Sequence, residues 1–178
     1  MKKILAVLLS LALFTTSCKK DGSVPEPQGN TPSQAVGQWM YGSFSMSEFW
    51  SYDGRYQGKP FELAVMFHFK SNGTYEKYFV ASTRDYSGCQ TQAFSSEKGR
   101  VKFDEDNGSF TTTPSEGTYR GFYSCAPNRN INRKMASSEL KSTTYFYRMV
   151  KGSNGKTNME VRFQETDQNV STFLPTAW

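Results

Sequence analysis

The chain has 178 residues, with 21 Lys and Arg against 16 Asp and Glu, which gives a formal net charge of +5. This excess is too small and too scattered for the dense basic stripe of a nucleic-acid-binding protein, so we expect no nucleic-acid partner. Aromatic residues make up 15% of the chain, and such side chains favour pleated, half-buried strands. The length is typical of one domain.

The first 17 residues follow the pattern of a bacterial secretion signal. Lys2 and Lys3 provide a positive start, and the apolar run at 4–14 is shorter than the roughly 20 residues of a bilayer-spanning helix. Small residues precede Cys18, and this arrangement resembles the lipobox of bacterial lipoproteins. The resemblance implies lipidation of Cys18 and a stable anchor of several acyl chains. The alternative is an ordinary secretory leader followed by a chance cysteine.

The residues after the lipobox indicate in which membrane the protein is located. Lys19 stands where an Asp would favour retention in the inner membrane, so the resemblance implies the outer membrane. The sequence does not distinguish the periplasmic face of the outer membrane from the cell surface. Proline, glycine and polar residues then predict a flexible tether. The expected division is a signal peptide at 1–17, a lipidated cysteine and tether at 18–35, and one β domain at 36–178.

Within the predicted domain, apolar residues alternate with others at the period of a strand. The alternation is clearest over residues 61–70 and ends at Asn72-Gly73, a strong signal for a tight hairpin turn. The same dipeptide at Asn107-Gly108 and Asn154-Gly155 predicts two more hairpins. Only residues 132–141 have the spacing of a short helix.

These signals together predict an all-β antiparallel domain of about 8–10 strands. An up-and-down barrel is the first interpretation, and a β-sandwich is the alternative. The predicted strands cover residues 36–46, 61–70, 74–81, 100–104, 109–113, 117–125, 142–150, 158–165 and 168–174.

The first predicted strand opens with Gly37-Gln38-Trp39, and a Gly-x-Trp at this place resembles the lipocalin motif. The resemblance implies a barrel with Trp39 at its closed base and an arginine from a late strand packed over the indole ring. Arg148 is the first candidate for that arginine, and Arg162 is the second. The second motif of the lipocalins, an Asp within a hairpin turn, is not clearly present.

A loop rich in aromatic residues is predicted after the first strand, at 48–58. In a lipocalin-like barrel this loop would cover the mouth of the cavity. Trp50, Tyr52 and Tyr56 could then line an apolar ligand site or stack on sugar rings. The alternative is that these aromatic residues only attach the loop to the rim.

Cys89 and Cys125 remain once Cys18 is assigned to the anchor. In an oxidising compartment an even pair favours a disulfide bond. Free thiols remain an alternative, as does a metal site completed by His68, the one histidine of the chain.

The sequence contains no nucleophile motif, phosphate-binding loop or metal-spaced cluster, so it names no catalytic residue, metal ligand or cofactor. We expect a lipid-anchored envelope protein whose cavity binds a small apolar or amphipathic ligand. The alternative is an interaction lipoprotein with a filled core that binds an unknown protein partner or a glycan through its rim. An enzyme assembled from distant residues is a third hypothesis.

Overall fold

The computed structural model describes residues 31–42, 62–153 and 155–177. This part of the chain is all-β, as the sequence predicts. The elements are β1 (Gly37–Gly42), β2 (Glu62–Phe69), β3 (Thr74–Arg84), β4 (Gln90–Asp104), β5 (Ser109–Tyr123), the 3-10 helix η1 (Pro127–Arg129), β6 (Ile131–Lys134), β7 (Thr143–Lys151), β8 (Thr157–Arg162) and β9 (Ser171–Thr176). In these three ranges, no helix has the length and apolar character needed to cross a membrane.

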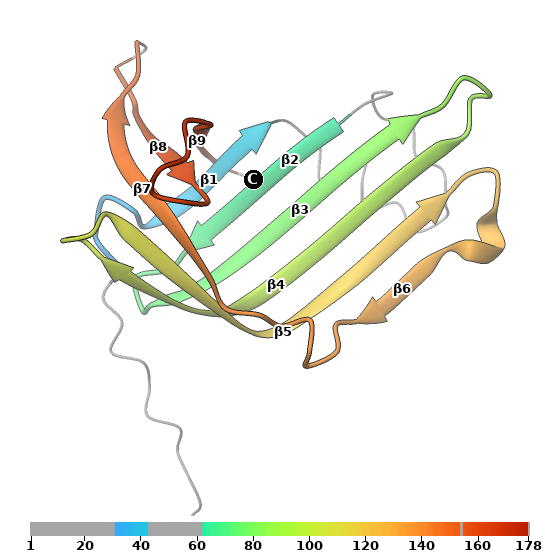
Figure 1. Cartoon of the computed structure of the whole chain (residues 1–178), viewed down its shortest axis with the longest axis horizontal. Helices are drawn as coiled ribbons and strands as arrows, with labels where there is room; N and C mark the ends of the chain where they lie inside the picture. Colours follow the sequence, from blue (N-terminus) through green and yellow to red (C-terminus); the bar gives the residue numbers. More distant parts are fainter. Residues whose placement is uncertain (1–30, 43–61, 154, 178) are drawn as a thin grey trace, which may run out of the picture.

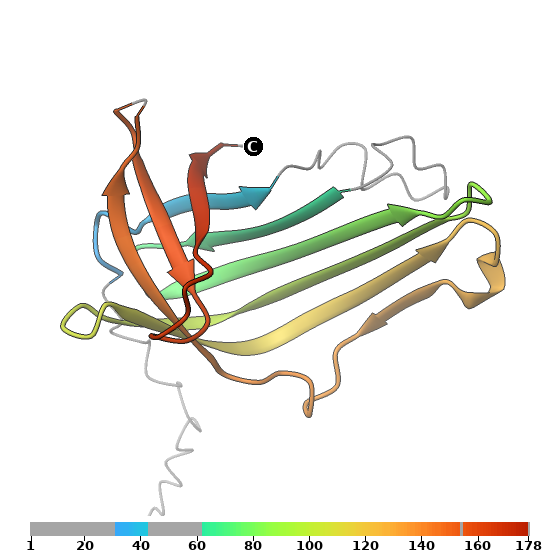
Figure 2. The same cartoon turned by 45° about the horizontal axis from the view of Figure 1, so that its top comes forward.

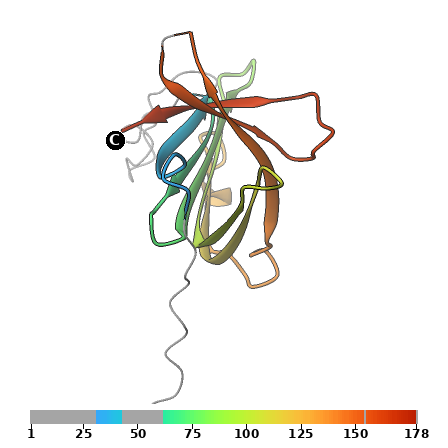
Figure 3. The same cartoon turned by 90° about the vertical axis from the view of Figure 1, so that its left-hand side faces the viewer.

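The strands form one antiparallel sheet in the order β4-β3-β2-β1-β9-β8-β7-β5-β6. An additional pairing of β4 with β5 closes this sheet in a ring, which is seen end-on in Figure 3. β6 lies outside the ring, against residues 118–121 of β5. A β-sandwich requires two packed sheets, whereas the described strands form a single sheet.

The ring is complete at one end only. β7 pairs with residues 109–112 of β5, and β9 pairs with residues 38–40 of β1. By contrast, β4 and β5 each run for 15 residues and continue well past these pairings (Figures 1 and 2). We call the end crossed by β7, β8 and β9 the closed end. We call the extension formed by residues 78–84, 90–96, 117–123 and 131–134 the distal half.

Aromatic side chains fill the closed end. Phe110 is fully buried there and stacks on Tyr145, with ring centroids 5.0 Å apart. It also meets Phe69 at 5.1 Å, Phe103 at 5.3 Å and Phe67 at 5.5 Å, mostly edge to face. Such geometries add to the stabilisation that comes from burying the rings. The closed end is therefore a packed core.

The predicted hairpins are confirmed. Gly73, Gly108 and Gly155 have φ angles of 76°, 56° and 75°, in the left-handed region that glycine adopts without strain. The predicted alternation over residues 61–70 also holds for the inner face of β2, where Phe67 is buried in the core. The other face of β2 was expected to be exposed, but it is buried too: Met66 on that face is 0% exposed.

Two predicted strand boundaries are wrong. β4 begins ten residues earlier than expected, and residues 109–123 form one strand instead of two. Pro114 is tolerated within β5 because it lies between the stretches that pair with β7 and β6, beside an irregularity of β5 opposite Lys98 and Gly99. A Cβ atom at Gly99 would lie 2.1 Å from the Thr113 carbonyl oxygen, so only glycine allows this approach.

The predicted helix at 132–141 is also wrong, because this stretch contains most of β6 and a following turn. The packed domain begins before residue 36. The Thr31 hydroxyl group donates a hydrogen bond to the Lys70 carbonyl oxygen at 2.8 Å, and Ala35 is fully buried. Residues 31–35 therefore belong to the domain and not to the tether.

Candidate binding site

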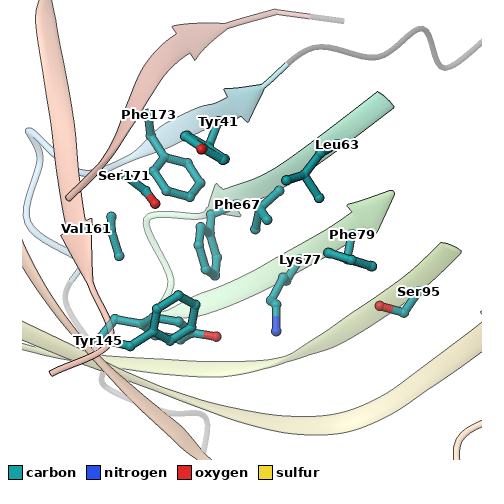
Figure 4. Close-up of a pocket in the computed structure, with 12 residues that line it drawn as sticks. Tyr41, Leu63, Phe67, Lys77, Phe79, Ser95, Tyr145, Val161, Ser171 and Phe173 are labelled. Carbon is teal, nitrogen blue, oxygen red and sulfur yellow. The ribbon is translucent and has the colours of Figure 1, made fainter. Parts of the chain in front are cut away.

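A cavity of about 340 Å³ lies inside the ring, beside the aromatic core (Figure 4). Leu63, Val65 and Phe79 line it from β2 and β3, while Val161 and Phe173 line it from the opposite wall. This volume and this largely apolar lining are typical of small-molecule sites.

The cavity runs from the core to the surface. Phe67 and Tyr145 line it at the core side, and both are almost fully buried. Phe163, which also lines the cavity, is 67% exposed, and Leu63 is 38% exposed. A ligand could therefore enter beside Phe163 and Leu63 without opening the aromatic core.

A charged pair lies where the packed core ends. Phe67, Lys77 and Glu97 are direct neighbours across β2, β3 and β4, so their side chains share the inner face. The Lys77 ammonium nitrogen lies 3.4 Å from a Glu97 carboxylate oxygen, and the two side chains are only 21% and 18% exposed. Burying charges is costly even when they are paired. This pair therefore stands out on an otherwise apolar surface.

Lys77 and Tyr145 approach each other across the cavity (Figure 4). Burial by itself would lower the pKa of Lys77, but the neighbouring Tyr145 and Glu97 outweigh it, and the pKa is raised. Lys77 is therefore a cation at neutral pH. The described lining accordingly combines apolar walls with one ammonium group, the phenols of Tyr41 and Tyr145, and the hydroxyl groups of two serines.

A second hollow continues from the cavity over the distal half. Its volume is about 400 Å³, and it shares Phe79 and Ser95 with the cavity. Ala93 and Gly121 are small, and they leave room on β4 and β5. The two spaces are therefore neighbours along the inner face of the sheet, and we call them together the groove.

An ion pair borders this second hollow. Arg133 lies over the ring of Tyr119 at 5.0 Å, and its guanidinium group binds the Glu139 carboxylate through both oxygens, at 2.7 and 2.8 Å. The hydrogen bond from Arg133, followed by one from the Ala136 N–H, lowers the pKa of Glu139 to about 2. Arg133 itself lies on an ordered strand, β6.

Trp39 lies in the core of the closed end. It is 5% exposed, and its indole N–H donates a hydrogen bond to the Ala35 carbonyl oxygen at 2.8 Å. The arginine expected over its ring is not Arg148. That residue lies on the outward face of β7 and pairs with Glu160 on β8. Its neighbours Tyr145 and Tyr147 point inward instead, because side chains alternate along a strand.

The alternative arginine, Arg162, donates a hydrogen bond to the Glu165 carbonyl oxygen. The lid residues Trp50, Tyr52 and Tyr56 lie outside the described residues, as does the lipidation site Cys18. Lid and anchor therefore stay predictions.

Cys89 and Cys125 are bonded, as expected, with Cα atoms 5.5 Å apart. The bond joins the β3–β4 turn to the end of β5, at the tip of the distal half. Hydrogen bonds beside it also join these segments, because Gln90 and Ser124 exchange two of them. Among the described residues, no group of three His, Cys, Asp or Glu side chains could hold a metal ion.

No motif in the sequence singles out Lys77, Glu97 or Tyr145. A signal for Lys77 was available, because it occupies an inward position of β3 between Tyr75 and Phe79. Glu97 had no such signal, since the first half of its strand was not predicted.

Comparisons with known proteins add no further assignment: no family model, no curated protein and no solved structure matches the chain.

Proposed function

We propose that this chain is a lipid-anchored binding protein of the bacterial cell envelope, built on a lipocalin-like barrel, whose cavity takes a small apolar or amphipathic ligand. The observation that carries the proposal is the apolar cavity of about 340 Å³ inside the ring. A water-filled apolar space loses stabilising contacts, and an apolar ligand would restore them.

The position of the cavity supports a binding role. The aromatic core at the closed end is tightly packed. The cavity beside it is therefore not a sign of a poorly packed fold. Its walls come from strands near the start of the domain's sequence and from strands near its end. The cavity therefore lies within the closed sheet. Sites on strands of a rigid sheet hold a ligand in a defined orientation.

Filling the cavity tests the proposal. Ser95 lines both the cavity and the second hollow, so Ser95→Phe places a ring in the ligand space. We expect a neutral hydrophobic dye such as Nile red to bind the wild type saturably, and this substitution to weaken binding about tenfold or more. Ser171→Phe, from the opposite wall, should act in the same way. Ser137→Phe is the matched control, because Ser137 is exposed in the turn after β6.

Thermal unfolding of each variant separates loss of binding from loss of structure. If the wild type binds no dye, or if both wall variants remain folded and bind it as tightly as the control, the cavity is not a ligand site.

The anchor is tested separately by Cys18→Ser. The proposal expects the wild type in the outer-membrane fraction of a density gradient, and the variant to be lost from it, because several acyl chains anchor a protein stably. A variant that stays in the membrane fraction would contradict the lipid anchor and would leave the cavity proposal intact.

A further inference from the structure

We propose that the cavity selects single-chain amphiphiles with an anionic head, and that Lys77 and Tyr145 hold that head at the inner end of the cavity. This inference rests on the proposed binding function, because it specifies which ligand the cavity takes. It makes Lys77 the residue that determines specificity.

The first support is the sign of the charge inside the cavity. Among the described residues that line it, only Lys77 is charged. Its counter-ion Glu97 is not part of the lining, and lies on the neighbouring strand. A ligand in the cavity would therefore meet the ammonium group before the carboxylate, which favours a negative head.

The second support is the hydrogen-bonding capacity left at Lys77. An ammonium group has three donors, and the hydrogen bonds of Lys77 with Tyr145 and Glu97 use two of them. Its nitrogen lies 3.4 Å from the Glu97 oxygen, beyond the roughly 2.7–2.9 Å of a strong charge-assisted hydrogen bond. Lys77 can therefore donate to an incoming carboxylate without first breaking a short ion pair. The Tyr145 hydroxyl group beside it can donate a second hydrogen bond to the same head.

The third support is the shape of the groove beyond this head site. From Lys77, the inner face continues to Phe79, its neighbour two residues along β3, and to Val65 across on β2. Past Ser95, the small residues Ala93 and Gly121 keep the groove open into the second hollow. An unbranched apolar chain fits this path, because it can extend along the strands while its head stays at Lys77.

The inference is tested with three ligands of one chain length: dodecanoic acid, dodecanol and dodecylamine. Binding is measured at neutral pH, below the concentration at which these amphiphiles self-associate, by displacement of Nile red. We expect the wild type to bind the acid about tenfold or more tightly than the alcohol, because a hydrogen bond to a charged head is stronger than one to a neutral head. The amine should bind most weakly, since it meets a like charge.

Substitution of Lys77 then identifies the head site. Lys77→Met keeps the apolar part of the side chain, and should abolish the preference for the acid while leaving alcohol binding nearly unchanged. Lys98→Met is the matched control, because Lys98 lies on the same pair of strands but is exposed and outside the cavity. Tyr145→Phe should reduce the preference for the acid in part.

Glu97→Gln provides an independent variant that retains the cation. It removes the competing carboxylate, so it should increase the preference for the acid over the alcohol. If the wild type binds acid and alcohol equally, or if a folded Lys77→Met keeps the preference, the anionic-head inference is wrong and the binding function stands. If Lys77→Met does not fold, an unchanged or smaller preference in Glu97→Gln overturns the inference. If the dye binds but none of the three ligands displaces it, the inference is wrong and the proposed binding function stands. If the dye itself does not bind, the proposed function fails.

Discussion

The closed end and the distal half of this sheet are stabilised in different ways. In the closed end, Phe110 lies at the centre of an aromatic cluster and makes ring contacts with residues of β2, β4 and β7. In the distal half, the small residues Ala93, Ser95 and Gly121 lie among larger ones such as Phe79 and Tyr119, and a hollow of about 400 Å³ remains. That half ends instead in the Cys89–Cys125 bond.

This difference shows how one sheet can serve both stability and binding. The tightly packed rings around Phe110 leave no room for a ligand among them, whereas a half of the sheet with an unfilled hollow needs another source of rigidity. A covalent cross-link provides that rigidity without occupying the inner face. Lys77 lines the groove where the packed core ends.

The largest expected effect is on the closed end. Phe110→Ala removes a fully buried ring at the centre of the cluster and should lower the free energy of unfolding by about 3–5 kcal/mol. The control is Phe79→Ala in the groove, which should cost only about 1–2 kcal/mol because Phe79 is half-buried. Denaturant unfolding measures both. Equal costs would mean that the groove is as tightly packed as the core, and the comparison would fail.

An intermediate effect is expected at the tip of the distal half. Replacing both Cys89 and Cys125 by Ala removes a cross-link with a sequence separation of 36, which the chain-entropy model values at up to about 4 kcal/mol. Hydrogen exchange should rise first in the β3–β4 turn and at the end of β5, and least around Phe110. If protection is lost first around Phe110, the distal half does not depend on its cross-link.

The smallest effect is expected at alkaline pH. Burial, followed by the hydrogen bond with Glu76, raises the pKa of Tyr78 to about 12 from an ordinary value of 10.0. Burial raises the pKa of Tyr75, in the closed end, further still. The unfolded chain therefore loses these protons at lower pH than the folded chain does. The stabilisation is complete below pH 10 and falls as the pH rises toward 12 and beyond.

Tyr75→Phe and Tyr78→Phe should each reduce this alkaline loss of stability. The effect of Tyr75→Phe should be the larger, because the tyrosine in the closed end is the more buried of the two. Unfolding measured at several pH values above neutral checks the order. A larger effect of Tyr78→Phe would reverse the comparison between the two regions.

Much of the fold was predictable because its signals are local. The three Asn-Gly dipeptides identify turns by the φ angles that a tight turn needs, and the alternation in β2 follows from the period of a strand. The disulfide was predictable from the number of cysteines and the expected compartment. The first half of β4 was missed, because residues 90–99 are mostly polar and show little alternation. The helix at 132–141 was wrong because Ile131–Lys134 pairs with a strand edge that no local pattern reveals.

The candidate site depended on tertiary structure. Lys77 and Glu97 are 20 residues apart in the chain, and only the register of β3 and β4 makes them neighbours. Tyr145 lies near Lys77 because β7 crosses the ring. Arg148 does not contact Trp39, because side chains alternate along β7 and that of Arg148 points outward. The sequence by itself therefore determined most of the strands, their tight turns and the aromatic residues available to the core, since these follow from interactions between near neighbours. Tertiary structure decided where the ring closes and which charge faces the cavity, since both depend on pairings between distant strands.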